Sequence, residues 1–215
     1  MPRPKRNKRT PPYHHGDLAA ALIAAAEGIL AERGLDGFTL RECARRAGVS
    51  HAAPAHHFGD ANGLLTAVAT SGYERLTQAM REGAEREKDR GTALVAIGVA
   101  YVRFALTHPA LFRLMFHSDR LDRTDDAFRA AGKAAFEVLS GRLAVVRGRG
   151  TQLTPPETGR HPTLLRAWAV VHGMATLAIE GRLGPRGKTR DRELLDTVRA
   201  ALSMQADAYR RESGG

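Results

Sequence analysis

The sequence of 215 residues predicts an all-α protein. Apolar residues recur at the 3.6-residue period of a helix along most of the chain, and glycine or proline follows several of these periodic segments. A capping box from Thr39 to Glu42 adds a third indication, because it marks the start of a helix. From the order of these signals we expect an N-terminal arm over residues 1–12, a three-helix region over 13–75 and a larger helical region over 76–215.

The first helix is expected from Asp17 to Arg33. Asp17 is a suitable N-cap, and Gly34 follows the last turn, where a glycine ends many helices. The apolar stripe of this helix consists of Leu18, Leu22, Ile23, Ala26, Ile29 and Leu30. Such a stripe predicts an amphipathic helix with one face in the core.

The segment from Thr39 to Phe58 is predicted to form a helix, a three-residue turn and a second short helix. Thr39 caps the first helix, and Glu42 three positions later completes the capping box. Gly48 supplies the turn, because glycine adopts the left-handed backbone conformation without a steric penalty from a Cβ atom. Ser50 is expected to cap the second helix. This shape is typical of proteins that place one helix in the major groove of DNA.

The second helix of this motif is slim and carries polar side chains. Pro54 falls in its first turn, where a missing amide proton matters least. Ala52 can contact a thymine methyl group, while His51 or His56 can reach base edges or phosphates. The alternative is a plain corner between two helices, with the histidines facing solvent.

The charge of the chain favours a polyanionic partner. It contains 33 Lys and Arg against 23 Asp and Glu, which gives a net charge of +10 and a pI of about 10.6. Residues 1–9 hold five positive charges and no acid, at Arg3, Lys5, Arg6, Lys8 and Arg9. We expect a flexible arm that follows phosphates or enters the minor groove, so that deleting residues 2–9 lowers DNA affinity strongly at low salt. The alternative is a cleavable or solubilising tail.

The remaining helices are expected in the second region. One of them must end near Thr107, because Pro109 follows and the residue before a proline disfavours helical geometry. Glycines and prolines between Arg147 and Pro162 predict a mobile loop. In chain order, the other expected segments are a helix from Leu64 to Ala84, a charged break from Glu85 to Arg90, a helix from Leu94 to Thr107, a short apolar segment from Leu111 to Phe116, and helices over Asp126–Val146, Thr163–Gly181 and Asp191–Arg211.

The last two helices carry wide apolar stripes. Two antiparallel helices with more apolar surface than one neighbour can cover are candidates for packing against their own copies across a two-fold axis. A homodimer would hold two recognition helices about one turn of DNA apart, which suits a palindromic site. An ordinary pair of core helices is the alternative.

The chain has the features of a cytoplasmic protein. Its single cysteine, Cys43, excludes a disulfide framework and a multi-cysteine zinc site, and we expect it to be a small buried thiol. No apolar run approaches the length of a membrane span, and the N-terminus is too charged and proline-rich for a signal peptide. We therefore expect no membrane partner.

Several of these segments together resemble the DNA-binding domain of TetR-type transcriptional regulators. The resemblance covers residues 13 to about 72, and it is carried by Tyr13–Leu18, Ala31–Gly34, Leu40–Glu42, Ala44–Pro54 and His57–Phe58. The second region is similar to one branch of that family in Trp168, His172, Gly173 and the segment His108–Met115. The resemblance implies an all-helical homodimer whose C-terminal domain binds a small effector. It also implies a regulator, usually a repressor that leaves DNA on binding the effector, and not an enzyme.

The motif and the resemblance together give the expected contacts to a double-stranded DNA operator: Thr39, Arg41, Ser50, His51, Ala52, His56, His57, Tyr13, Arg6 and Arg9. Two positions depart from the family pattern. Ala55 and Ala61 stand where the family usually has an aromatic residue on the recognition helix and a Lys that opens the next helix, both of which touch phosphates. Losing such contacts should weaken binding and flatten its salt dependence by about 0.9 per charge neutralised. The basic arm can compensate.

A small-molecule pocket is expected in the second region. Its candidate lining is mostly apolar or aromatic and comprises Phe104, Phe112, Met115, Phe116, Trp168, His172 and Met174. His172 lies one turn after Trp168 and is the best polar candidate, as a hydrogen-bond donor to a ligand. Each of these residues taken alone also suits an ordinary core.

Other classes of function find little support in the sequence. It has no His-Glu-x-x-His pair, no phosphate-binding glycine loop and no Gly-x-Ser-x-Gly elbow, so we expect no enzyme, no cofactor and no metal centre. A metal sensor using His117, Asp119 and His172 is one alternative. We predict a sequence-specific transcriptional regulator, a repressor released from a palindromic operator by a small-molecule effector. A nonspecific nucleic-acid-binding protein is the other alternative.

Overall fold

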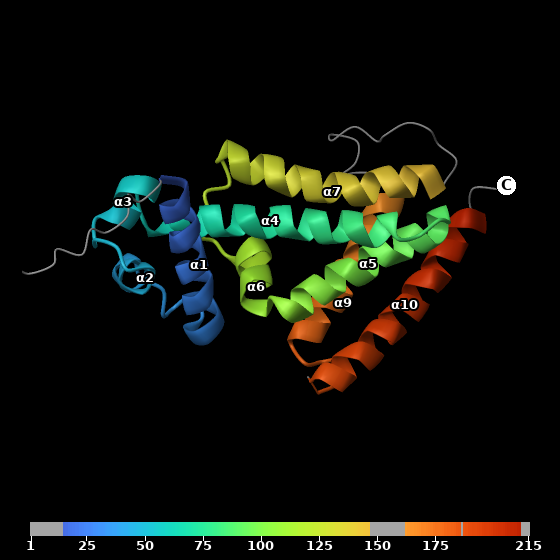
Figure 1. The fold of residues 1–215 in the computed structure, drawn as a ribbon. Coiled ribbons are helices and arrows are strands. Elements are labelled where there is room, and N and C mark those ends of the chain that lie inside the picture. The colour runs from blue at the N-terminus through green and yellow to red at the C-terminus, as the bar shows by residue number, and fades with distance from the viewer. Residues whose placement is uncertain (1–14, 147–161, 186, 212–215) are drawn as a thin grey trace, which may run out of the picture.

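The computed structural model describes residues 15–146, 162–185 and 187–211. Over these residues the chain is helical and contains no strand, which confirms the all-α prediction (Figure 1). The helices are α1 (His15–Arg33), α2 (Leu40–Ala47), α3 (Ala53–Phe58), α4 (Ala61–Glu85), α5 (Arg90–Thr107), α6 (Pro109–His117), α7 (Asp126–Val146), α9 (Pro162–Ile179) and α10 (Lys188–Arg211).

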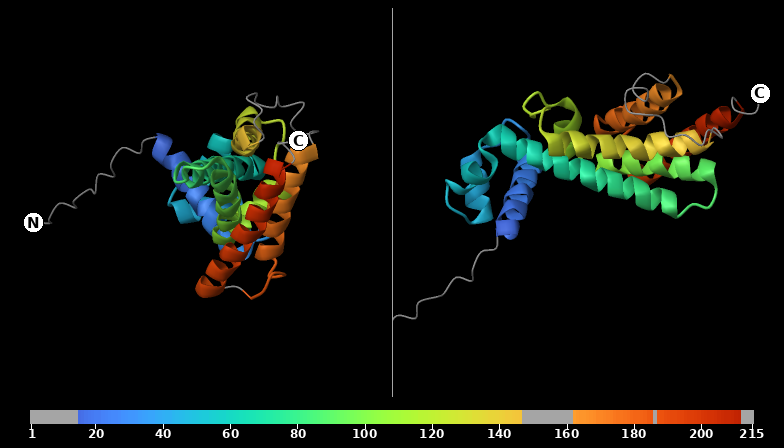
Figure 2. Two further views of the ribbon diagram at one scale, coloured as in Figure 1. Left: turned by 90° about the vertical axis from the view of Figure 1, so that its right-hand side faces the viewer. Right: turned by 90° about the horizontal axis from the view of Figure 1, so that it is seen from above.

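The helices form a short end and a longer body (Figures 1 and 2). The short end consists of α1, α2 and α3, and α4 runs from it along the body. α7 lies along α4, while α5 packs on α4, α7, α9 and α10. α6 lies at the junction, since it contacts α1 as well as α4 and α5. α4 continues without a break across residues 75 and 76, where the sequence predicts the boundary between the two regions. The short end and the body therefore share this helix.

α5 is the central helix of the body. Its mean hydropathy reaches 1.2 over 18 residues, so by length and composition it could cross a membrane. The prediction that no apolar run approaches this length is wrong. The reason for its composition is packing, because 72% of this window is buried inside the protein among the neighbouring helices. α5 is thus a core helix whose apolar side chains face other helices.

Several helix boundaries sharpen or correct the sequence predictions. α1 begins at His15, so Asp17 lies inside its first turn and is not its N-cap. α10 begins at Lys188, about one turn before the predicted start. α5 ends at Thr107 and α7 has the predicted span. The short apolar segment belongs to α6, which starts at Pro109 because a proline suits the first helical turn. Of the expected loop, residues 147–161 lie outside the described residues.

The start of α3 differs from the prediction. Its N-cap is Ala52, which makes no side-chain cap hydrogen bond, so the prediction that Ser50 caps this helix is wrong. The backbone closes the turn instead, because the Ala53 N–H donates to the Ser50 carbonyl oxygen at 3.0 Å. Pro54 in the first turn has no N–H that would need a cap.

Candidate nucleic-acid interface and interior cavity

The Thr39 cap and the left-handed Gly48 agree with the sequence prediction, but the connection between α2 and α3 has five residues, Gly48–Ala52, and not the predicted three. Thr39 is extended, and its Oγ1 accepts a hydrogen bond from the Glu42 N–H at 3.2 Å. Gly48 has a φ of 69°, in the left-handed region that disfavours residues with a Cβ atom. The Val49 N–H donates to the carbonyl oxygen of the fully buried Ala44 at 3.0 Å. These contacts hold α2 and α3 at a compact corner.

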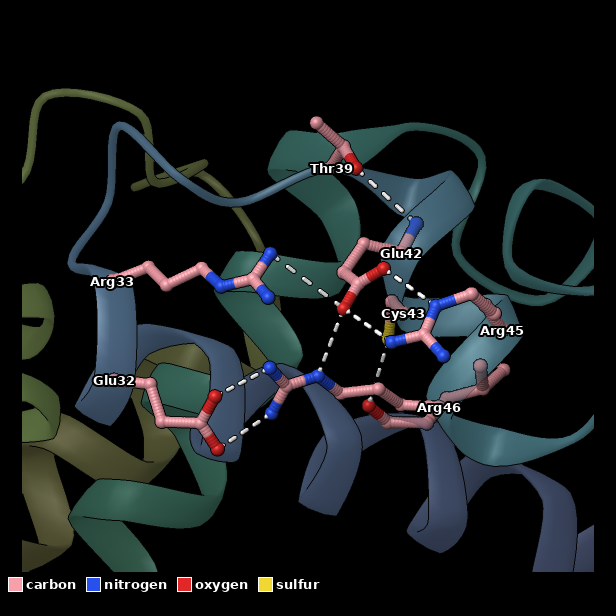
Figure 3. Close-up of polar contacts among 8 residues, drawn as sticks. Glu32, Arg33, Thr39, Glu42, Cys43, Arg45 and Arg46 are labelled. Atoms are coloured by element: carbon pink, nitrogen blue, oxygen red, sulfur yellow. Dashed lines mark hydrogen bonds and ion pairs between the residues drawn. The ribbon is translucent and has the colours of Figure 1, made fainter.

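The carboxylate of Glu42 interacts with three arginine side chains (Figure 3). It accepts two hydrogen bonds from Arg45 at 2.8 Å and one from Arg46 at 3.1 Å, and Arg33 of α1 lies 3.7 Å away. Arg46 also donates to Glu32 of α1 at 2.8 Å. The hydrogen bonds from Arg45 and then Arg46 lower the pKa of Glu42 to about 2. This Glu42 cluster fastens α2 to α1 and occupies Arg45 and Arg46.

Cys43 adds a second tie between α2 and α1. Its side chain is fully buried, and its Sγ donates a hydrogen bond to the Leu22 carbonyl oxygen at 3.2 Å. Burial raises the pKa of the thiol to about 11, so Cys43 stays protonated at neutral pH. The prediction of a small buried thiol is confirmed.

Most expected DNA contacts that the structure describes lie at the surface of the short end. The exposed ones are Thr39, Arg41, Ser50, His51, Ala52 and His56. His57 is half-buried, with its ring centroid 6.2 Å from that of Phe58. Ala55 is exposed and Ala61 is half-buried. Tyr13, Arg6 and Arg9 lie outside the described residues.

A second tight corner joins α3 to α4. Asp60 caps α4 by accepting a hydrogen bond from the Gly63 N–H at 2.8 Å. A Cβ atom at Gly63 would lie only 1.9 Å from the Phe58 carbonyl oxygen, so only glycine fits here. The segment after α6 reinforces this end of α4, because Arg120 Nε donates to Asn62 Oδ1 at 3.1 Å. Sequence reasoning missed Gly63, although a glycine in the first turn of an expected helix was an available signal.

The body contains an interior cavity of about 250 Å³ bounded by α4, α5, α7, α9 and α10, with one side chain from α6. Apolar and aromatic side chains predominate, and the described residues that line it include no Lys, Arg, Asp, Glu or His. Its aromatic side chains are Tyr73, Tyr101, Phe116, Phe136, Trp168 and Tyr209. Gln205 of α10 contributes an amide to the lining.

A polar pair, the buried Tyr101 and the half-buried His172, lies beside the cavity. Tyr101 Oη and His172 Nδ1 lie 2.8 Å apart and share a hydrogen bond. Burial raises the pKa of Tyr101. Burial, and then the charge of His117, lower the pKa of His172. Both side chains are therefore neutral at physiological pH, and they bring no charge to the cavity wall.

The residues expected around a pocket occupy different places in the body. Phe116 and Trp168 line the cavity. His172 is absent from the lining but is hydrogen-bonded to Tyr101, which belongs to it. The others lie elsewhere: Phe112 and Met115 are fully buried in the core, Phe104 has its ring centroid 5.1 Å from that of His108, and Met174 borders a separate groove between α9 and α10.

Sequence reasoning did not include the lining residues of α4, α7 and α10. Tyr73 and Gln205 come from helices far apart in the chain, and only packing brings them together. The wide apolar stripe of α10 was the available signal, but it does not identify which helix faces it. The described part of the chain holds no group of three or more His, Cys, Asp and Glu side chains arranged to hold a metal ion.

Two protein families match the sequence. The family described as Tetracyclin repressor-like, C-terminal domain, matches residues 94–202. The family described as Bacterial regulatory proteins, tetR family, matches residues 22–68. The first match alone spans half of the chain.

Known proteins resemble the chain over most of its length or over part of it. A protein of unknown function from Rhodococcus sp. RHA1 has a solved structure with 37% sequence identity and a TM-score of 0.73, covering 94% of this chain and 98% of that one. FadR from Bacillus subtilis, solved in complex with stearoyl-CoA, has 13% identity and a TM-score of 0.63, covering 87% and 97%. The transcriptional regulator CymR from Pseudomonas putida is 40% identical over 78 residues, which are 36% of this chain. The match spans only 37% of CymR.

Proposed function

The chain belongs to the TetR family of bacterial regulatory proteins, and from this premise we propose that it represses its target genes from a palindromic operator and leaves the DNA when a small-molecule effector binds. Membership of the family makes the chain a DNA-binding transcription regulator and not an enzyme. Repression, the operator and release by an effector are the parts that we propose.

This proposal rests on the exposed surface of α3, which lies between two tight turns, one to α2 and one to α4. Gly48 sets the corner with α2, and Gly63 sets the corner with α4. His51, Ala52 and His56 are exposed between these corners, where side chains of these types can reach base edges and phosphates. A rigid frame of this kind aims a short helix at a groove without further ordering when DNA binds.

The surroundings of α3 supply further contacts in the proposed complex. Arg41 is exposed, and within the described ranges it makes no ion pair, so its charge is available for a phosphate. Thr39, Ser50 and His57 complete the described set. We also include Tyr13, Arg6 and Arg9, in keeping with the net charge of +10.

We propose that the regulator is a homodimer formed through α9 and α10. Large apolar side chains on these helices are exposed, with exposed fractions of 52% for Leu165, 43% for Leu177 and 74% for Met204. A second copy packed on this face would remove them from water, which favours association. The dimer would hold two α3 helices about one turn of DNA apart, roughly 34 Å, to match a palindrome.

We propose that the effector binds in the interior cavity. A volume of about 250 Å³ lies just below the range of roughly 300–1,000 Å³ that is usual for ligand sites. Phe116 and Trp168 would contact the ligand directly, and His172 would act through Tyr101. FadR from Bacillus subtilis, which shares the fold, was solved with an organic ligand, stearoyl-CoA.

We assign the basic arm to residues 1–12, the DNA-binding domain to 13–75 and the effector-binding and dimerisation domain to 76–215. The double-stranded operator, the effector and a second copy of the chain are the proposed partners. A regulator of this kind acts in the bacterial cytoplasm, where its DNA lies.

Selection of genomic fragments tests the proposal. Purified protein is mixed with fragments of its own genome at near-physiological salt, and the retained DNA is sequenced. We expect a few fragments that share an inverted repeat, bound at least about a thousandfold more tightly than random DNA. Ala55→Glu places a negative charge on the exposed face of α3 and should abolish the selection, whereas Ala130→Glu on the exposed face of α7 should not.

Two outcomes would contradict the proposal. Retention of all fragments alike would support the nonspecific nucleic-acid-binding alternative, which the basic arm suits. Retention of none would mean that Ala55 and Ala61, in place of two phosphate-contacting residues, leave too few contacts for specific binding.

A further inference from the structure

We propose that the interior cavity binds an uncharged aromatic molecule of one or two rings, whose single hydroxyl or carbonyl group is hydrogen-bonded by Gln205. This inference names the chemical class of the effector, and it rests on the proposed function. Four properties of the cavity lead to it: its volume, its lack of charge, its aromatic walls and its free amide.

The volume of the cavity sets the size of the ligand. An apolar cavity of about 150 Å³ in another protein is large enough for benzene. The cavity here, at about 250 Å³, leaves room for a substituted ring or two fused rings. A ligand of that size would lie between helices α4, α5, α7, α9 and α10, with one side of the cavity open toward solvent.

The lack of charge in the lining excludes an ionic ligand. A carboxylate or an ammonium that entered would lose its hydration without meeting an opposite charge, which is strongly unfavourable. Arg166 is the nearby cation, with its guanidinium 4.6 Å from the centre of the Tyr209 ring. It is exposed and does not belong to the lining. Tyr73 stays neutral as well, because burial raises its pKa to about 12.

The aromatic walls favour an aromatic ligand. Tyr73 and Phe116 pack edge to face, with ring centroids 5.4 Å apart. Phe136 and Trp168 do the same at 6.0 Å and an interplanar angle of 85°. Rings arranged in this way offer both edges and faces to a further ring, which gains stacking or edge-to-face contact in addition to apolar burial.

Gln205 is a polar group of the lining with unused hydrogen-bonding capacity. Tyr73 Oη donates to the Met115 carbonyl oxygen at 3.3 Å, and Tyr101 Oη is paired with His172. The half-buried Gln205 amide has no hydrogen-bond partner among the residues that the structure describes. An amide offers two donors and an acceptor, so a hydroxyl or a carbonyl can satisfy it. A hydrocarbon of the same shape would leave it unpaired.

Calorimetry on the full-length protein, with no DNA present, tests the class of ligand. The probes are two matched pairs that differ only in the polar group, 4-isopropylphenol with 4-isopropylbenzoate and 2-naphthol with 2-naphthoate, together with naphthalene. We expect at least one phenol to bind, and to bind at least about tenfold more tightly than its carboxylate, because the carboxylate must be desolvated without a counter-charge. The fluorescence of Trp168, the chain's only tryptophan, reports binding at this cavity.

Two substitutions locate the binding and the polar contact. Gly132→Leu fills the cavity from α7 and should abolish binding; a Cβ atom at this position meets only the Tyr73 ring, at 3.9 Å, so the fold should tolerate it. Gln205→Leu keeps the approximate size of the side chain. It should weaken the binding of 2-naphthol by about fivefold and leave the binding of naphthalene unchanged. Gln78→Leu, the same change at an exposed position of α4, is the matched control. Melting curves followed by circular dichroism check that each variant is folded.

Each contrary result overturns a defined part of the proposal. Carboxylates that bind as tightly as the phenols, or no binding of either phenol, would overturn the uncharged class. If folded Gln205→Leu lost affinity for 2-naphthol and for naphthalene by the same factor, the role of Gln205 would be overturned. These titrations contain no DNA, so they are independent of the selection of genomic fragments. If no probe binds but a specific operator is found, the ligand class is wrong and the proposed regulatory function is unaffected. If a probe binds but no operator is found, the regulatory function is wrong.

Discussion

The short end and the body of this molecule are stabilised by different interactions. At the short end, Glu42 and its arginines tie α2 to α1 at the protein surface, and α3 is set by glycine corners. In the body, apolar and aromatic side chains from distant segments surround a cavity, and the Tyr101–His172 pair lies beside it. Ion pairs near the surface respond to pH and salt, whereas apolar packing responds to side-chain volume. The comparison teaches that DNA binding and ligand binding can be perturbed separately, by different kinds of substitution.

The largest effect is expected from Phe112→Ala in the body. Phe112 is fully buried in α6, with its ring centroid 4.7 Å from that of Phe116 and 5.6 Å from that of Tyr101. The substitution should lower the free energy of unfolding by about 3–5 kcal/mol, measured by urea denaturation. Phe136→Ala, at a half-buried position, should cost less.

The same experiment tests whether the two parts unfold together. α6 contacts α1 as well as the body, and α4 runs through both parts, so a single transition is expected. Two separate transitions would contradict this expectation, because the short end would then unfold independently of the body. A loss below about 1 kcal/mol would mean that the core around Phe112 relaxes to fill the space.

Gly63→Ala should disturb the short end with a smaller loss of stability. The new methyl group would clash with the Phe58 carbonyl oxygen, so α3 must shift, at a cost of about 1–3 kcal/mol. DNA affinity should fall more than ligand affinity. The control is Gly28→Ala in α1, where the nearest atom, on Arg46, is 3.5 Å away, and where alanine should stabilise the helix by up to about 1 kcal/mol. Equal effects of the two substitutions would contradict the role assigned to this corner.

The pH dependence of stability should distinguish the Glu42 cluster from the body. The pKa of Glu42 falls from its ordinary value of 4.5 to about 2 in the folded protein, chiefly through Arg45. Its stabilisation is therefore complete above pH 4.5 and is lost as the pH falls toward 2. In Glu42→Gln the melting temperature should be lower at pH 7, and the difference from the natural protein should shrink steadily below pH 4.5. A constant difference down to pH 2 would contradict this assignment.

Two arginines of α2 provide a matched test of the DNA interface. Arg41 is exposed and available, whereas Arg45 donates two hydrogen bonds to Glu42. Arg41→Ala should lower the slope of log affinity against log salt by about 0.9, as expected for one lost phosphate contact. Arg45→Ala should change this slope less. The measurement is a salt titration of operator binding, and a larger change for Arg45 would show that the Glu42 cluster opens on DNA.

The smallest effect is expected from Tyr101→Phe. This substitution removes the hydroxyl that is paired with His172 and keeps the ring that lines the cavity. The free energy of unfolding should fall by about 1 kcal/mol, with DNA affinity unchanged. A change in the salt dependence of DNA binding would contradict the independence of the two parts.

The helix-turn-helix end could be predicted from the sequence because its determinants act within their own segment. Thr39 and Gly48 each fix the backbone where they stand, so spacing alone was sufficient. Even there the prediction for Ser50 was wrong, since a backbone hydrogen bond closed the turn in place of a side chain. Gly63 matters through its distance to Phe58, which follows from the angle between two helices and not from either helix alone.

The cavity could be predicted only in part. Helical periodicity indicates which face of a helix is apolar, but not which neighbour that face meets. Phe112 and Phe116 lie one turn apart on α6, yet one is sealed in the core and the other reaches the cavity. Gln205 is a polar residue on a helix expected mainly to dimerise, and its place in the lining depends on how α10 packs on α5.

Cys43 makes the natural chain well suited to site-specific labelling. Its thiol is buried and has a pKa of about 11, so almost no thiolate is present to attack a maleimide at pH 7. A cysteine introduced at the exposed position Ala31 of α1 would react much faster, and the native cysteine need not be removed. A spin label placed there would report the position of the short end without occupying the DNA-facing surface of α3. In a dimer, the distance between two such labels would follow the separation of the two short ends as DNA and ligand are exchanged.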